Sequence, residues 1–108
     1  MVDVESDGPC PGLYSMVSFG AVSCVDVTKT FYGETAPISA DFVPDALAIS
    51  NITRAQHLNF PDPKETMEKF AVWINETCGK QRPMFISDNN GFDWQFINYY
   101  FHKFLGYN

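Results

Sequence analysis

The chain has 108 residues, the length of one domain or of part of one. Its apolar share of 45% and aromatic share of 16% suffice for a hydrophobic core and exclude an intrinsically disordered chain. The net charge of −6 argues against passive nucleic-acid binding through a basic surface, but an enzyme that meets phosphate through metal ions remains open.

Targeting signals and cysteines indicate where the protein works. No apolar run is long enough to span a membrane and no signal-peptide pattern is visible, so we expect a cytoplasmic protein. The three cysteines, Cys10, Cys24 and Cys78, are an odd number without metal-ligand spacing. They suit a reducing compartment, where we expect them to serve as small core residues.

The first eight residues predict a strand with two acids on one face. Asp3 and Glu5 alternate with Val2 and Val4, and successive side chains of a strand point to opposite faces. The two acids then lie about 6.6 Å apart at Cα, where like charges destabilise an ordinary strand. A hard divalent cation would remove the repulsion. The alternative is an exposed edge strand whose acids face water.

The middle of the chain predicts further strands, a short helix, a second short element and then a longer helix. Turn formers at residues 8–12 precede a long central strand at residues 14–27 and a return strand at residues 30–35. Residues 44–50 predict a short helix, and a second short element follows Asn51 with Arg54, Gln56 and His57 on it. The two histidines, His57 and His102, lack partners at ligand spacing and are expected to be packing or surface residues.

The longer helix that follows is the best specified. Asp62 is its expected N-cap, Pro63 takes the first helical position, and Glu65 completes a capping box. Gly79 is the stop signal. The apolar run at residues 83–87 then predicts a buried strand.

The last helix carries a second unusual acid. It follows the turn at residues 88–91, continues to about Leu105 and stops at Gly106. Asp93 heads its apolar stripe, which contains Phe96, Ile97, Tyr100 and Phe104. An unpaired buried carboxylate is costly. Either the helix dipole, worth roughly 0.3–1 kcal/mol, or a metal ion would compensate.

Together the two acidic segments resemble the DEDD-type 3′–5′ exonucleases, a superfamily that includes RNase T and the proofreading subunit of bacterial DNA polymerase III. Residues 3–8 (DVESDG) are similar to its first motif, D-x-E-(S/T)-(T/D)-G. Residues 89–96 (NNGFDWQF) are similar to its second, N-x-x-F-D-x-x-F. Ile52 and Thr53 are placed like its GIT element, and the match covers essentially the whole chain.

The resemblance implies an RNase H-like α/β fold, a mixed sheet flanked by helices, and two ions, Mg²⁺ or Mn²⁺, about 3.5–4 Å apart. By position, Asp3 would bridge both ions, Glu5 would complete one of them, and Asp93 would hold the second. The substrate would be the 3′ end of a single-stranded nucleic acid, either DNA or RNA. The residues expected to line the pocket for the terminal nucleotide are Ser6, Asp7, Gly8, Asn89 and Phe92, with Ile52 as a wedge near the terminal base.

The sequence also departs from the superfamily. A complete member has a third motif with a His or Tyr base and a fourth acid, and none occurs before Asn108. We therefore expect an incomplete domain, truncated at the C-terminus. The apolar face of residues 92–105 would then be partly bare, which favours self-association, for example as a homodimer.

Three hypotheses stay open: an incomplete metal-dependent exonuclease, a non-catalytic RNase H-like module that binds nucleic acid or protein, and a plain structural domain. The first predicts that alanine at Asp3 or Asp93 abolishes turnover without lowering the stability of the metal-free protein. The third predicts that both substitutions destabilise it by more than about 2 kcal/mol.

Overall fold

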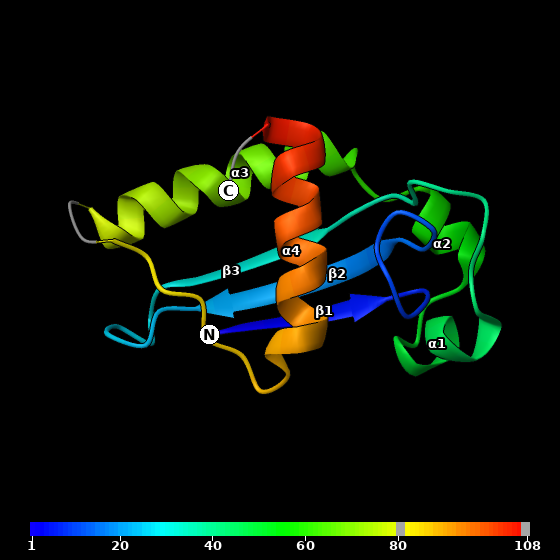
Figure 1. Cartoon of the computed structure of the whole chain (residues 1–108), viewed down its shortest axis with the longest axis horizontal. Coiled ribbons are helices and arrows are strands. Elements are labelled where there is room, and N and C mark those ends of the chain that lie inside the picture. Colours follow the sequence, from blue (N-terminus) through cyan, green and yellow to red (C-terminus); the bar gives the residue numbers. More distant parts are fainter. Residues whose placement is uncertain (80–81, 107–108) are drawn as a thin grey trace.

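Three antiparallel strands lie side by side in sequence order in the computed structural model, which describes residues 1–79 and 82–106 (Figure 1). They are β1 (Val2–Ser6), β2 (Met16–Val22) and β3 (Thr30–Glu34). β2 is the central strand, as predicted, but it is shorter than residues 14–27. Its end is set by a turn in which the Ser23 N–H donates to Lys29 O at 3.0 Å.

The register of β1 against β2 sorts the side chains as the alternation predicts. Val2 pairs with Ala21 and Val4 pairs with Phe19 on the buried face. Asp3 and Glu5 point to the other face. The register shifts between Glu5 and Ser6, an irregularity of the kind that re-aims side chains near functional sites.

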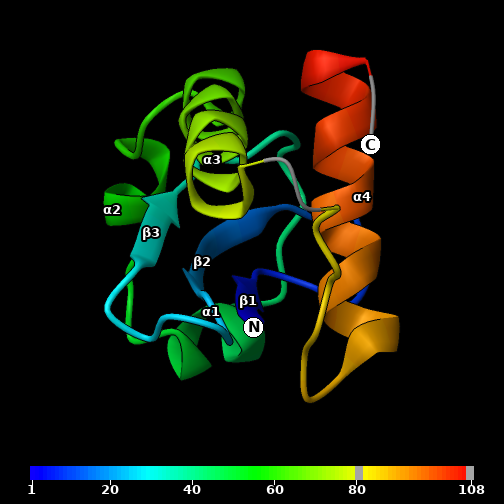
Figure 2. The same cartoon turned by 90° about the vertical axis from the view of Figure 1, so that its left-hand side faces the viewer.

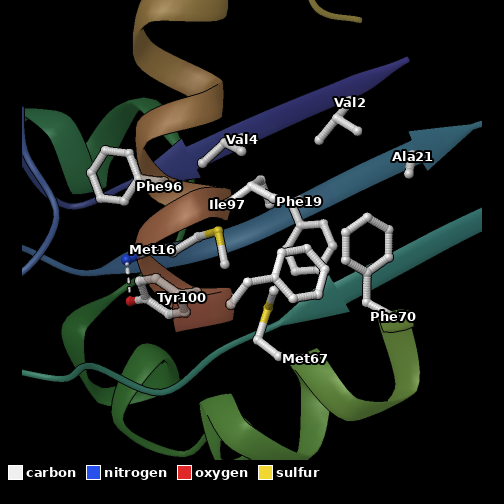
Figure 3. Packing of buried hydrophobic residues seen from close by; sticks show 11 residues of the cluster. Val2, Val4, Met16, Phe19, Ala21, Met67, Phe70, Phe96, Ile97 and Tyr100 are labelled. Atoms are coloured by element: carbon white, nitrogen blue, oxygen red, sulfur yellow. Dashed lines mark hydrogen bonds between the residues drawn. The ribbon is translucent and has the colours of Figure 1, made fainter. Parts of the chain in front are cut away.

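Two long helices, α3 (Pro63–Cys78) and α4 (Asn90–Leu105), cover the apolar face of the sheet (Figure 2). Figure 3 shows Met67 and Phe70 of α3, and Phe96 and Ile97 of α4, in one cluster over the strands. The Tyr100 hydroxyl accepts the Met16 N–H at 2.7 Å and so ties α4 to the start of β2. The short helices α1 (Pro44–Ile49) and α2 (Arg54–Leu58) lie at the end of the sheet toward which β1 runs (Figure 1).

The predicted helix ends are largely confirmed. Asp62 caps α3 by accepting the Lys64 N–H at 2.9 Å, and Gly79 follows the last turn. The capping box predicted with Glu65 is instead formed at α2, between Thr53 and Gln56. α4 ends at Gly106, whose φ of 77° lies in the left-handed region that favours glycine.

Two further predictions are wrong. Residues 83–87 form a loop whose Met84 is 82% exposed. A short apolar run does not by itself secure strand pairing, and this one makes a single hydrogen bond to the edge of β1, from the Val2 N–H to Ile86 O at 2.8 Å. The cysteines are not core residues, because Cys24 is exposed and the other two are half-buried.

The α/β class is therefore confirmed, although the sheet of the described residues is antiparallel rather than mixed. Within these same residues, no helix combines the length and apolar character needed to cross a membrane.

Candidate active site

The edge of β1 is where the two acidic segments meet. Asp93, in the first turn of α4, is only 4% exposed, and its Oδ1 accepts the Val4 N–H at 3.1 Å. Because β1 is an edge strand, no neighbouring strand offers a carbonyl oxygen that could accept this N–H. The packing of α4 thus brings the carboxylate to the backbone of the residue between Asp3 and Glu5, and both the helix terminus and this hydrogen bond stabilise it there.

The three carboxylates interact electrostatically. Partial burial, and then the negative charges of Asp3 and Asp93, raise the pKa of Glu5. In the described part of the chain none of the three takes part in an ion pair. Such mutual repulsion is what a divalent cation relieves, and hard carboxylate oxygens are the ligands that Mg²⁺ and Mn²⁺ prefer. The carboxylate oxygens of Asp3, Glu5 and Asp93 are therefore donors of the chemical type that these ions bind.

The side chains do not converge into a ready metal cage. As they stand in residues 1–79 and 82–106, no group of three or more His, Cys, Asp or Glu side chains is placed to hold an ion. Asp3 is exposed, Glu5 is half-buried, and Asp93 is held against the strand.

Sequence patterns do not reveal a fourth residue at the site, Ser50 at the end of α1. Its hydroxyl lowers the pKa of Glu5, but by less than burial and the charges of Asp3 and Asp93 raise it. Ser50 Oγ is nevertheless buried and has no partner within hydrogen-bond geometry, so its influence on the carboxylate is weak. Asn51 follows with a φ of 60°, and this left-handed turn leads to Ile52.

Asp7 anchors the end of β1 through a buried ion pair. Its carboxylate is fully buried and lies 2.9 Å from Arg54 Nη1, while its other oxygen accepts the Ser15 N–H at 2.6 Å. His57 Nδ1 lies 3.7 Å from Asp7, and His57 Nε2 is 3.2 Å from Met16 O. Burial lowers the pKa of His57, which is a packing residue as predicted.

Ser6 and Gly8 also have internal partners. The Ser6 hydroxyl donates to Gly8 O at 2.8 Å, and a Cβ on Gly8 would collide with the ring of Tyr14. The structure therefore gives Ser6, Asp7 and Gly8 a role in holding β1, and their contact with a nucleotide stays a prediction.

The other predicted nucleotide contacts lie around the start of α4 and after α1. Asn89 is exposed, and its carbonyl accepts the N–H groups of Phe92 and Asp93 at 3.0 and 2.8 Å. Phe92 is half-buried against Phe96, with ring centroids 5.2 Å apart, and Ile52 is half-buried. Their nucleotide contacts likewise remain predictions.

Comparison with known proteins gives one informative match. No protein-family model matches the sequence. The chain is 42% identical over 109 residues to a curated Escherichia coli protein named 3′–5′ DNA exonuclease Cap18, a match that covers 99% of this chain. The chain is therefore similar to part of a protein named as a 3′–5′ exonuclease. It spans 58% of the length of that relative, so the activity, substrate and partners of the whole protein are proposals.

Proposed function

We propose that this chain forms the metal-binding part of a DEDD-type 3′–5′ exonuclease with an RNase H-like fold. The observation that carries the proposal is the hydrogen bond between Asp93 and the Val4 N–H, 89 positions apart in sequence. It brings the acid of the second motif to the strand that carries both acids of the first. The similarity to a relative named as a 3′–5′ exonuclease supports the same function.

The proposed ion ligands are Asp3, Glu5 and Asp93, with Mg²⁺ or Mn²⁺ as the ions. Two bound ions would supply positive charge that activates a water and stabilises the leaving 3′ oxygen. Asp93 is held by the backbone of β1, so its position does not depend on the ion. Asp3 is exposed, so an ion bound to it would be open to a substrate. A cation beside Asp3 and Asp93 would also lower the raised pKa of Glu5, because it would offset the two negative charges that raise it.

The proposed substrate is the 3′ end of a single-stranded nucleic acid. The chain carries a net charge of −6, so ions rather than a basic surface would offset the charge of the phosphate. DNA is the first substrate to test, because the E. coli relative is named as a DNA exonuclease.

The test is degradation of 5′-labelled single-stranded DNA and RNA oligonucleotides with Mg²⁺, with Mn²⁺ and with EDTA. We expect a ladder that shortens from the 3′ end, is lost with EDTA, and is lost in Asp3→Asn. Glu68→Gln is the matched control, since it removes one exposed acid from α3, away from the site, and should leave the ladder unchanged.

The same assay is run on a chain that also carries the remaining segment of the E. coli relative. Isothermal titration with Mn²⁺ accompanies both assays. If neither chain cleaves nucleic acid, and Asp3→Asn leaves Mn²⁺ binding unchanged, the exonuclease proposal is wrong. A non-catalytic binding module is then the better description.

A further inference from the structure

The hydroxyl of Ser50, the residue that follows the last turn of α1, is buried without a hydrogen-bond partner. Among the side-chain oxygens and nitrogens that the structure describes, it alone is buried in this way. An unpaired buried polar group is unfavourable, and such exceptions in folded proteins call for a specific cause, such as an ion or the chemistry of a site. The position of Ser50 therefore has to be explained by what lies beside it.

Ser50 is tied to the strand that carries the acids. The Val43 N–H donates to Asp7 O at 2.7 Å and fixes the start of α1 to the end of β1. Arg54, at the start of α2, pairs with the carboxylate of the same Asp7 at 2.9 Å. Asp7 thus holds the two helices that flank Ser50 in sequence, and it follows Glu5 by two positions (Figure 1). A hydroxyl that is held by fixed elements is preorganised for its partner.

The backbone around Ser50 adds to this rigidity. The Ser50 N–H donates to Leu47 O at 3.1 Å, and the Asn51 N–H donates to Ala48 O at 3.0 Å. Asn51 then turns the chain with a φ of 60°, and the capping box of Thr53 begins α2 almost at once. The Ser50 hydroxyl is therefore carried by a short link that is hydrogen-bonded on both sides.

Glu5 is the acid of the site that lacks a positioning group. Asp93 is held by the Val4 N–H at 3.1 Å, whereas no hydrogen bond of regular geometry reaches the Glu5 carboxylate in the part of the chain that the structure describes. The Ser50 hydroxyl lies close enough to this carboxylate to lower its pKa. A carboxylate that binds a metal is usually oriented by a further hydrogen bond from a neighbouring residue.

On the basis of the proposed function, we propose that Ser50 is a positioning residue of the ion site, whose hydroxyl donates to the Glu5 carboxylate when a divalent cation holds that carboxylate. This arrangement accounts for both observations. The hydroxyl is buried because it belongs to the site, and it is unpaired because Glu5 takes up its final position only with the ion.

The test compares Ser50→Ala with the native 108-residue chain by Mn²⁺ titration calorimetry and by urea unfolding in EDTA. We expect alanine to weaken Mn²⁺ binding by about tenfold or more, since loss of a hydrogen bond to a metal ligand typically costs about 10–100-fold in affinity. Without metal, alanine should leave the urea midpoint unchanged or raise it, because the deleted hydroxyl has no partner. A serine with a merely structural role would instead give a lower midpoint and an unchanged affinity.

Three further variants serve as controls. Ser50→Thr keeps the hydroxyl and should restore most of the Mn²⁺ affinity. Ser23→Ala removes the acceptor of the Asp26 N–H at 3.2 Å, in the turn at the end of the sheet opposite α1. It should lower the urea midpoint and leave the Mn²⁺ affinity unchanged. Asp3→Asn reports on the ion site itself and should abolish binding.

The possible failures can be told apart. If Asp3→Asn abolishes Mn²⁺ binding but Ser50→Ala binds as tightly as the native chain, or Ser50→Thr binds as weakly as Ser50→Ala, the role of Ser50 is wrong and the proposed function stands. If Ser50→Ala lowers the urea midpoint in EDTA, the hydroxyl already has a partner in the metal-free chain, such as a water, and the inference is wrong. If the native chain shows no Mn²⁺ binding that depends on Asp3, the proposed function fails and this inference fails with it.

Discussion

Replacing Asp93 separates its charge from its hydrogen bond. Asp93→Ala removes the acceptor of the Val4 N–H and leaves a donor unpaired at a nearly closed site. Leaving such a donor unsatisfied costs about 1–3 kcal/mol. Relief of repulsion with Glu5 offsets part of that cost, so we expect a net loss of about 1–2 kcal/mol in metal-free protein. The motif-based expectation is instead that alanine at Asp93 raises the stability of the metal-free protein or leaves it unchanged, so the measurement decides between the two.

Asp93→Asn is the matched variant, because its carbonyl oxygen can still accept the Val4 N–H while the charge is gone. We expect its free energy of unfolding to equal or exceed that of the native chain. Urea unfolding followed by circular dichroism at pH 7 in EDTA compares the three proteins. A loss of about 1–2 kcal/mol corresponds to a fall in Tm on the order of 10 °C. If alanine and asparagine variants are equally stable, the hydrogen bond does not hold Asp93 in place and the geometry of the site is wrong.

Three further predictions concern the residues around the site. Burial, Asp3 and Asp93 raise the pKa of Glu5 above 4.5 in the folded chain, so the contribution of Glu5 to stability is complete below pH 4.5 and is lost as the pH rises through the raised pKa. Without metal, Glu5→Gln should therefore unfold at a higher temperature than the native chain at pH 7, and this difference should shrink near pH 4. A difference that stays constant with pH would contradict this. Arg54→Ala removes the ion-pair partner of the fully buried carboxylate of Asp7 and should cost about 3–5 kcal/mol in urea unfolding. The double variant with Asp7→Asn should be more stable than Arg54→Ala alone. A double variant that is no more stable would show that the charge of Asp7 is not the source of the loss. Gly8→Ala forces a Cβ into the ring of Tyr14 and should lower the free energy of unfolding by about 1–3 kcal/mol. Gly20→Ala is the control, because its Cβ would have open space around it, and it should leave the free energy of unfolding nearly unchanged.

Local patterns were sufficient for most of the elements. The alternation of Val2 and Val4 with two acids predicts which face of β1 is buried, because side chains of a strand alternate regardless of what they pack against. The ends of α3 and α4 follow from Asp62, Gly79 and Gly106, since capping is a property of neighbouring residues. The acids at Asp3, Glu5 and Asp93 were likewise found from short motifs.

Long-range contacts decided the rest. The meeting of Asp93 with Val4 joins residues 89 positions apart, and the ion pair of Asp7 with Arg54 joins residues 47 apart. The hydrophobic periodicity of the sequence does not reveal such distant pairs. The approach of Ser50 to Glu5 likewise depends on where α1 lies. Residues 83–87 look like a buried strand because they are apolar, yet strand pairing requires a run of backbone hydrogen bonds along the neighbouring edge, and the described contacts with β1 are limited to the one from the Val2 N–H to Ile86 O. The sequence by itself therefore determined most of the elements and, through the resemblance of its motifs, proposed which acids belong together. Only the tertiary structure placed Asp93 against the edge of β1, because only packing brings distant side chains to one strand.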